Sequence, residues 1–257
     1  MKKRRKVIIG LALLICISVV VSGCKSKKNI VKEMTPLMYE YQKRPLMEYF
    51  SSGESSILIQ NSASNVLENG DSLTKGMVLK YYPTEKKAYG EYFEWLFPKE
   101  DGKEDEEKNF PVMYENGNYY MKEGIELTEE IKNFKFMVEE FDFTQEYTKN
   151  LKIEKSGYNF EVPDYSLLYE LPKNDDMIKN YIKNKQLLKY DYATDIGFSR
   201  NGNGYSGGRI KLNIHRNPNI YISESISRDT SETSGNDYRA LFLGEETENE
   251  QETSDLQ

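Results

Sequence analysis

The feature that most constrains the fold is a period-two alternation of apolar and polar residues over much of the chain after residue 56. Successive side chains of a strand point to opposite faces of a sheet, so this alternation is typical of strands with one buried face. The clearest example has four aromatic residues on one face and two other residues opposite: Tyr89, Phe93, Trp95 and Phe97, against Tyr92 and Glu94. One-sided burial favours an antiparallel sheet.

Turn signals between the alternating runs predict hairpins. Asn116–Gly117 separates the runs 110–114 and 119–121, and this dipeptide supplies the positive φ that a tight hairpin turn requires at both positions. Ser156–Gly157 separates the runs 151–155 and 158–162 in the same way. Asn217–Asn219 joins the last two alternating runs. These turns again indicate antiparallel neighbours.

A few segments have helical periodicity instead. Apolar residues from Ile30 to Tyr41 recur at spacings of three and four, with Thr35–Pro36 as a candidate start. Residues 173–185 have Asn174 as a candidate N-cap. Residues 127–141 fit a helix that Thr128 would cap, although the aromatic stretch 134–143 also leaves a strand open. Residues 238–243 form an apolar island that we expect to dock as a final strand.

The predicted fold class is α+β, with a mainly antiparallel, curved β-sheet built from hairpins and a few packed helices. A signal peptide and a tether precede it. The predicted boundaries are 1–23 for the signal peptide, 24–49 for a lipidated tether and N-terminal helix, 50–227 for the β-rich domain and 228–257 for a flexible acidic tail. The tail contains acids but no bases after residue 243, which predicts disorder.

The first residues indicate export. Five basic residues at positions 2–6 precede the uncharged run Val7–Val21, and small residues follow before Cys24. A basic start, a short apolar segment and a small-residue cleavage site are typical of a secretory signal peptide. Fifteen uncharged residues are short for a helix that spans a bilayer.

The run Val21–Cys24 resembles the lipobox of bacterial lipoproteins, in which a branched apolar residue and two small residues precede a cysteine. The resemblance implies cleavage between Gly23 and Cys24 and a diacylglyceryl group on the Cys24 thiol. The lipid would hold the chain on the extracytoplasmic face of the cell membrane, and the bilayer would be its partner. An uncleaved anchor or an ordinary secreted protein are the alternatives. Frequent Lys, Asn, Ile and Tyr favour an AT-rich genome and a Gram-positive cell surface.

Composition excludes several classes of function. Two Cys and one His cannot build a Cys₄ zinc site or a multi-histidine metal site, and Cys16 leaves with the signal peptide. The mature chain carries 30 basic and 42 acidic residues, a formal net charge of −12, which argues against a nucleic-acid partner. No cofactor is expected beyond the covalent lipid on Cys24, and no metal.

Apparent catalytic motifs lack the context that their chemistry needs. Residues 202–208 fit both G-x-G-x-x-G and G-x-S-x-G, but a period-two run follows them where a helix would be required. His215, at the end of that run, is interpreted as a solvated side chain. We therefore expect a protein that is not an enzyme.

The aromatic face of Tyr89, Phe93, Trp95 and Phe97 is the remaining candidate site. Such a face is either ordinary core or the lining of a groove for an acyl chain or a peptide. The helix after the lipobox and the hairpin strands resemble, in general features, the half-barrel lipoproteins of the LolA and LppX type. That resemblance implies a hydrophobic ligand in a curved sheet.

Three hypotheses follow. The first is a non-enzymatic lipoprotein that binds a hydrophobic ligand, lipid or peptide, or an envelope partner. The second is a cell-wall hydrolase that uses two carboxylates in a cleft, one of them with a raised pKa. The third is a structural or immunity-type partner with a flat polar surface.

Overall fold

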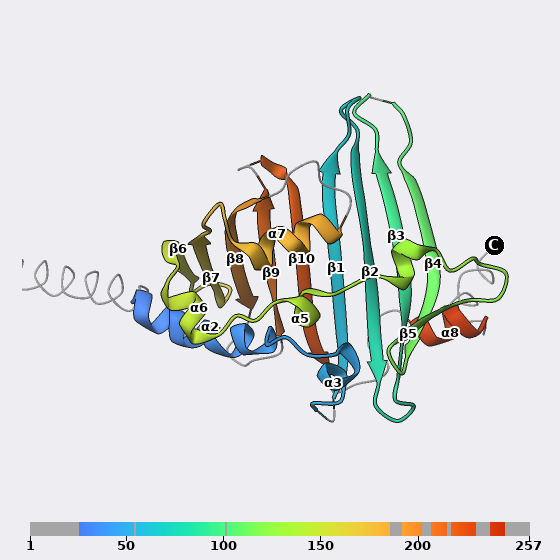
Figure 1. The fold of residues 1–257 in the computed structure, drawn as a ribbon, viewed down its shortest axis with the longest axis horizontal. Helices are drawn as coiled ribbons and strands as arrows, with labels where there is room; N and C mark the ends of the chain where they lie inside the picture. The colour runs from blue at the N-terminus through green and yellow to red at the C-terminus, as the bar shows by residue number, and fades with distance from the viewer. Residues whose placement is uncertain are drawn as a thin grey trace, which may run out of the picture.

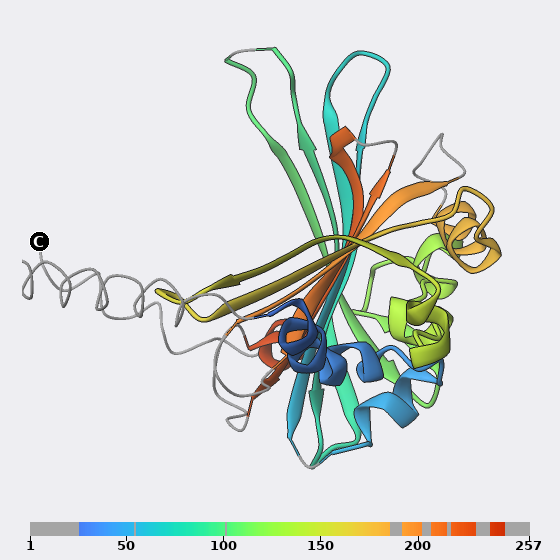
Figure 2. The ribbon, with the colours of Figure 1, turned by 90° about the vertical axis from the view of Figure 1, so that its left-hand side faces the viewer.

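The computed structural model describes residues 26–53, 55–100, 102–185, 192–201, 207–214, 217–229 and 237–244. A twisted and curved antiparallel sheet of ten strands is its centre, and short helices pack on it (Figures 1 and 2). The α+β prediction is therefore confirmed.

The strands and helices have the following bounds. The strands are β1 (Ser56–Val66), β2 (Ser72–Tyr82), β3 (Lys87–Phe97), β4 (Glu106–Glu115), β5 (Asn118–Met121), β6 (Lys152–Asn159), β7 (Asp164–Glu170), β8 (Ala193–Asn201), β9 (Gly207–Ile214) and β10 (Asn217–Asp229). The helices are α2 (Lys27–Glu40), α3 (Leu46–Phe50), α4 (Glu129–Lys132), α5 (Met137–Glu140), α6 (Gln145–Lys149), α7 (Asp176–Asn184) and α8 (Tyr238–Leu243).

Two meanders meet at the middle of the sheet. The strand order is β5-β4-β3-β2-β1-β10-β9-β8-β7-β6, so β1 to β5 run outward from the centre and β6 to β10 run back to it. Strands β1 and β10 pair with each other and join the two halves of the sheet, with Ser62 opposite Ser223. The first and last strands of the described chain thus form the central pair.

This order leaves one long connection. The chain leaves β5 at one edge of the sheet and enters β6 at the other, nine strand spacings away, or roughly 43 Å at the usual spacing. Residues 122–151 make the crossing over one face of the sheet and carry α4, α5 and α6 (Figure 1). The connection therefore forms part of the layer that covers this face.

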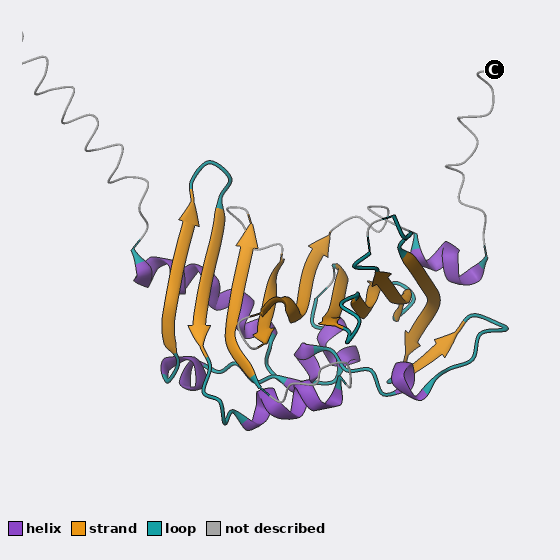
Figure 3. Ribbon diagram, turned by 90° about the horizontal axis from the view of Figure 1, so that it is seen from above, coloured by secondary structure: helices purple, strands orange, loops and turns teal. Residues whose placement is uncertain are grey.

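The two faces of the sheet differ in burial. Helices α2 to α7 lie on one face, whereas α8 lies on the other (Figure 3). In β1, Ile57, Ile59 and Ala63 are buried under the helices, while Gln60 and Ser62 on the opposite face are half-buried. We call the face without α2 to α7 the open face.

Several sequence predictions are confirmed. Asn116 and Gly117 have φ values of 52° and 84° and connect β4 to β5, as a tight hairpin requires. The helix predicted within 173–185 is α7, but its N-cap is Asp175 and not Asn174. The Asp175 carboxylate accepts a hydrogen bond from the N–H of Ile178, so Asp175, one residue after Asn174, is the residue that caps the helix.

The predicted start of the first helix is wrong. Helix α2 begins at Lys27, and Ser26 accepts a hydrogen bond from the N–H of Asn29 as its N-cap. Pro36 therefore lies inside the helix, which keeps its course because Ile30, Met34 and Leu37 bury one side of it against the sheet. Tertiary packing here outweighs the helix-breaking preference of proline.

Three other local predictions are also wrong. Residues 127–141 form neither one helix nor a strand but the two short helices α4 and α5, although Thr128 does cap α4. Ser156–Gly157 lies inside β6, and the turn to β7 falls at residues 160–163. Residues 238–243 form helix α8, which packs Phe242 against Tyr89 on the open face.

Some predictions lie outside the described residues. These are the signal peptide and lipobox at 1–24, the glycine-rich stretch 202–206, His215 and the acidic stretch 245–257. Across the ranges that the structure covers, no helix has the length and apolar character needed to cross a bilayer.

The buried tyrosines predict a loss of stability at alkaline pH. Tyr82, Tyr89, Tyr114 and Tyr169 are each at most 5% exposed, and burial raises the pKa of each to about 12 from 10.0. The unfolded chain ionises first, so the free energy of unfolding should fall as the pH rises from about 10 through about 12. Phenolate absorbance and urea unfolding at increasing pH measure both effects. Complete tyrosine ionisation in the folded chain near pH 10 would contradict this expectation.

Candidate functional site

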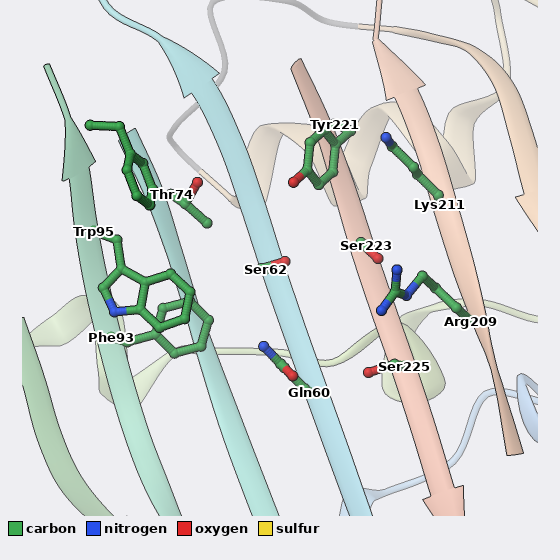
Figure 4. Close-up of a pocket in the computed structure, with 11 residues that line it drawn as sticks. Gln60, Ser62, Thr74, Phe93, Trp95, Arg209, Lys211, Tyr221, Ser223 and Ser225 are labelled. Atoms are coloured by element: carbon green, nitrogen blue, oxygen red, sulfur yellow. The ribbon is translucent and has the colours of Figure 1, made fainter. Parts of the chain in front are cut away.

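The open face contains a groove of about 330 Å³ near the middle of the sheet, here called the open-face groove (Figure 4). Its volume lies at the lower end of the range for ligand pockets, about 300 to 1,000 Å³. Strands β1, β2, β3, β9 and β10 provide its lining. The lining residues are Gln60, Ser62, Thr74, Phe93, Trp95, Phe97, Arg209, Lys211, Tyr221, Ser223 and Ser225.

One wall of the open-face groove is aromatic. Phe93 and Trp95 are stacked on β3, with ring centroids 4.5 Å apart and planes 27° from parallel. Gly76 on β2 faces the Phe93 ring, and a Cβ there would lie 2.5 Å from its tip. The missing side chain therefore makes room for the ring. Trp95 donates a hydrogen bond from Nε1 to Asn109 at 3.3 Å and stays half-exposed.

The opposite wall is cationic. Arg209 and Lys211 lie two residues apart on β9 and point to the same face, where the Lys211 ammonium is 3.9 Å from the centre of the Tyr221 ring (Figure 4). Neither cation forms an ion pair with a described residue. Burial lowers the pKa of Lys211, Arg209 lowers it further, and Asp195 opposes the shift. An anion between the two side chains would relieve their repulsion.

Small polar side chains form the floor between the two walls. Gln60 and Ser62 on β1 and Ser223 and Ser225 on β10 are half-buried. None of the four side chains hydrogen-bonds to another residue in the described part of the chain. The floor thus presents hydroxyl and amide groups that are available to a ligand.

The structure places the four predicted aromatic residues on one face of β3 but in two environments. Phe93, Trp95 and Phe97 line the open-face groove. Tyr89 lies beneath α8, 5.8 Å from the Phe242 ring, and is 3% exposed. The groove also has a cationic wall and a polar floor, which the period-two pattern of β3 did not predict.

A second polar cluster, which the sequence analysis missed, lies under the helices. Glu224 on β10 is completely buried and accepts hydrogen bonds from the N–H groups of Met137, at 2.6 Å, and Val138, at 3.2 Å. The Asn61 amide donates to Glu224 at 2.8 Å and to the Tyr181 hydroxyl at 2.9 Å. One carboxylate therefore connects the central strands to the first turn of α5.

Lys185, at the end of α7, completes this cluster. Its ammonium donates to the Asn61 side-chain oxygen at 2.9 Å and to the Lys135 carbonyl at 2.8 Å, and it lies 3.7 Å from the Phe134 ring centre. Burial lowers the pKa of Lys185 and raises the pKa of Glu224, while each charge favours the other. Asn61 thus links a cation to an anion across the layer between helix and sheet.

A signal for Glu224 was present in the sequence. It occupies the buried register of β10, where its neighbours two residues away are Ile222 and Ile226. An acid at an apolar position of an alternating strand indicates either a strand end or a buried polar contact. The amides that donate hydrogen bonds to it lie more than 80 residues earlier in the chain, so the sequence did not identify its partners.

The buried carboxylates do not form the cleft that a hydrolase would need. Burial raises the pKa of both Glu224 and Glu139. Both carboxylates, however, are occupied by backbone groups: Glu139 accepts a hydrogen bond from the N–H of Phe136, and Glu224 accepts hydrogen bonds from the next two N–H groups. The residues described as lining the open-face groove include no carboxylate. No group of His, Cys, Asp and Glu among the described residues is arranged to hold a metal ion.

The family of the chain follows from its central region. Residues 48–231, which include β1 to β10 and the crossing connection, match the Csa1 family, DUF576. The chain belongs to the Csa1 family. No curated protein matches it in sequence.

Two solved structures align with this Csa1 protein over much of its length but with very low scores. The dehydratase domain of the CurK module of curacin polyketide synthase is 10% identical, with 77% of this chain and 90% of that chain covered and a TM-score of 0.20. A DUF1329 family protein from Desulfovibrio piger is 12% identical, with 82% and 96% covered and a TM-score of 0.21. At TM-scores this low, neither alignment says anything about the fold or the function of this chain.

The Glu224 cluster predicts a large loss of stability on truncation. Glu224→Ala should lower the free energy of unfolding by about 3 to 5 kcal/mol, because the amides of α5 and Asn61 would remain buried without their acceptor. Urea unfolding followed by circular dichroism measures the change. Glu161→Ala, at an exposed turn, is the matched control and should stay within about 0.5 kcal/mol of the parent chain. Equal stability of both variants would contradict the role given to Glu224.

Proposed function

We propose that this Csa1 protein is a membrane-anchored extracytoplasmic binding protein without enzymatic activity, and that its ligand or envelope partner occupies the open face. The observation that carries this proposal is the two-sided sheet, with one face covered by α2 to α7 and the other hollowed by the open-face groove. A face that only filled a core would not leave Trp95 half-exposed across a groove from two cations that have no ion pair with any described residue.

The membrane anchor is supported by the sequence alone. The basic residues 2–6, the apolar run 7–21 and the lipobox Val21–Cys24 agree in order and spacing. A diacylglyceryl group on Cys24 supplies two acyl chains, which is the number that stable anchoring needs. Described structure begins at Ser26, two residues after this cysteine, so the tether would be short.

A binding role is favoured over hydrolysis by the placement of the acids. The hydrolase alternative requires a cleft with two carboxylates, one of which donates a proton. Between the helices and the sheet, the described acids whose pKa is raised accept hydrogen bonds from backbone amides at the start of α5. The lining of the open-face groove, by contrast, is cationic and aromatic. The same lining differs from the purely apolar surface expected for an acyl chain.

The lipid anchor predicts a shift in location on mutation of the lipobox cysteine. Cys24→Ala should abolish incorporation of labelled palmitate and either release the chain to the medium or leave the uncleaved precursor, because no thiol would accept the lipid. Fractionation, palmitate labelling and the mass of the mature chain measure these effects.

Cys16→Ala is the matched control, since Cys16 lies in the apolar run that cleavage would remove. This variant should keep the label, the membrane fraction and the mature mass. Membrane retention and palmitate labelling that persist in Cys24→Ala would overturn the anchor.

A further inference from the structure

We infer that the open-face groove binds an anionic oligosaccharide, with Arg209 and Lys211 on its acidic groups and Trp95 on a sugar ring. This inference rests on the proposed binding function and names the class of ligand at the same site. Three properties of the groove carry it: charge, floor chemistry and the shape of the aromatic wall.

The charge of the groove selects an anion. Arg209 and Lys211 lie on the same side of β9, repel each other and have no ion-pair partner among the described residues. The groove lining contains no acid, in a chain whose formal net charge is −7. Two cations concentrated at this place are complementary to an anionic group, and Arg209 can hold a carboxylate through two hydrogen bonds.

The floor selects a ligand with many hydroxyl groups. Between the cationic and aromatic walls lie Gln60, Ser62, Ser223 and Ser225, whose side chains make no hydrogen bond to other described residues. An acyl chain over this floor would remove water from these groups and return no hydrogen bonds, which is unfavourable. A sugar supplies both donors and acceptors to hydroxyls and amides.

The aromatic wall suits a flat ring. Trp95 stacks on Phe93, and Phe93 fills the space left by Gly76, so one face of the indole is supported while the side chain stays half-exposed (Figure 4). The C–H face of a pyranose packs on such a surface, as other apolar groups do. A rigid indole loses little conformational freedom on binding.

The groove is long enough for several units. The aromatic wall on β3 and the cationic wall on β9 are four strand spacings apart, or roughly 19 Å. Beyond Arg209 a second hollow of about 350 Å³ continues along the sheet and shares Arg209 and Ser225 with the first. It adds the hydroxyls of Ser199 and Ser227 to the polar lining. A chain of sugars fits this extended polar surface better than a single small anion does.

Isothermal titration calorimetry on the full chain in detergent micelles tests the inference. The probes are tetragalacturonate, its uncharged methyl ester, inorganic phosphate and sodium decanoate. We expect tetragalacturonate to bind at least about tenfold more tightly than the other three. Its affinity should fall as salt is added, because Arg209 is exposed and Lys211 is only half-buried, so salt screens both charges.

Variants locate the binding. Arg209→Ala, Lys211→Ala and Trp95→Ala should each weaken tetragalacturonate binding about tenfold or more. Lys155→Ala and Tyr120→Ala are matched controls, since they remove an exposed cation and an exposed aromatic ring outside the groove, and they should leave binding unchanged. Circular dichroism and urea midpoints equal to the parent's establish that each variant is folded.

Several outcomes would overturn the inference. Equal affinity for the methyl ester would mean that charge is not recognised, and equal affinity for phosphate would mean a bare anion site. Tight binding of decanoate that Trp95→Ala abolishes would assign an acyl ligand and leave the proposed binding function intact. No binding of tetragalacturonate also overturns the inference, whereas the Cys24→Ala experiment decides the membrane anchor separately.

Discussion

The Glu224 carboxylate is the contact on which the rest of the structure depends. The strand order forces residues 122–151 to cross from one edge of the sheet to the other, and most of the backbone hydrogen bonds of this connection lie within its own turns and short helices. Glu224, on a central strand, accepts hydrogen bonds from the N–H groups of Met137 and Val138, which lie midway along this connection. Asn61, on the other central strand, holds the same carboxylate and the Lys185 ammonium. One buried acid thus joins both meanders, the crossing connection and α7.

This arrangement places the side chains that pack under the helices and those that line the open-face groove on opposite faces of the same strands. In β10, Ile222, Glu224 and Ile226 point into the layer of helices, and Ser223 and Ser225 between them face the open-face groove. The side chains buried under the helices stabilise the sheet, so the side chains on the open face can contribute little to stability. Trp95, Ser223 and Ser225 on that face remain half-exposed.

Particular residues show how far sequence analysis reached. The alternation in β3 correctly predicted that Tyr89, Phe93, Trp95 and Phe97 share a face, and Asn116–Gly117 correctly predicted a hairpin. The start of α2 and the split of 127–141 into α4 and α5 were missed. In both segments tertiary packing decided the outcome: α2 continues through Pro36 because its apolar side is buried, and the crossing connection must extend between its two short helices.

The sequence by itself determined the fold class and the two-sided character of strands such as β1, β3, β4 and β9, because these features depend on neighbours within a few residues. It placed a turn inside β6, where the strand in fact continues. It also supplied the lipobox on which the anchor proposal rests. Only the tertiary structure decided that β9 lies four strands from β3, so that Arg209 and Lys211 share a groove with Trp95 more than 100 residues earlier. Strand order and the partners of Glu224 depend on contacts between distant segments, and period-two alternation is the same whichever strand is the neighbour.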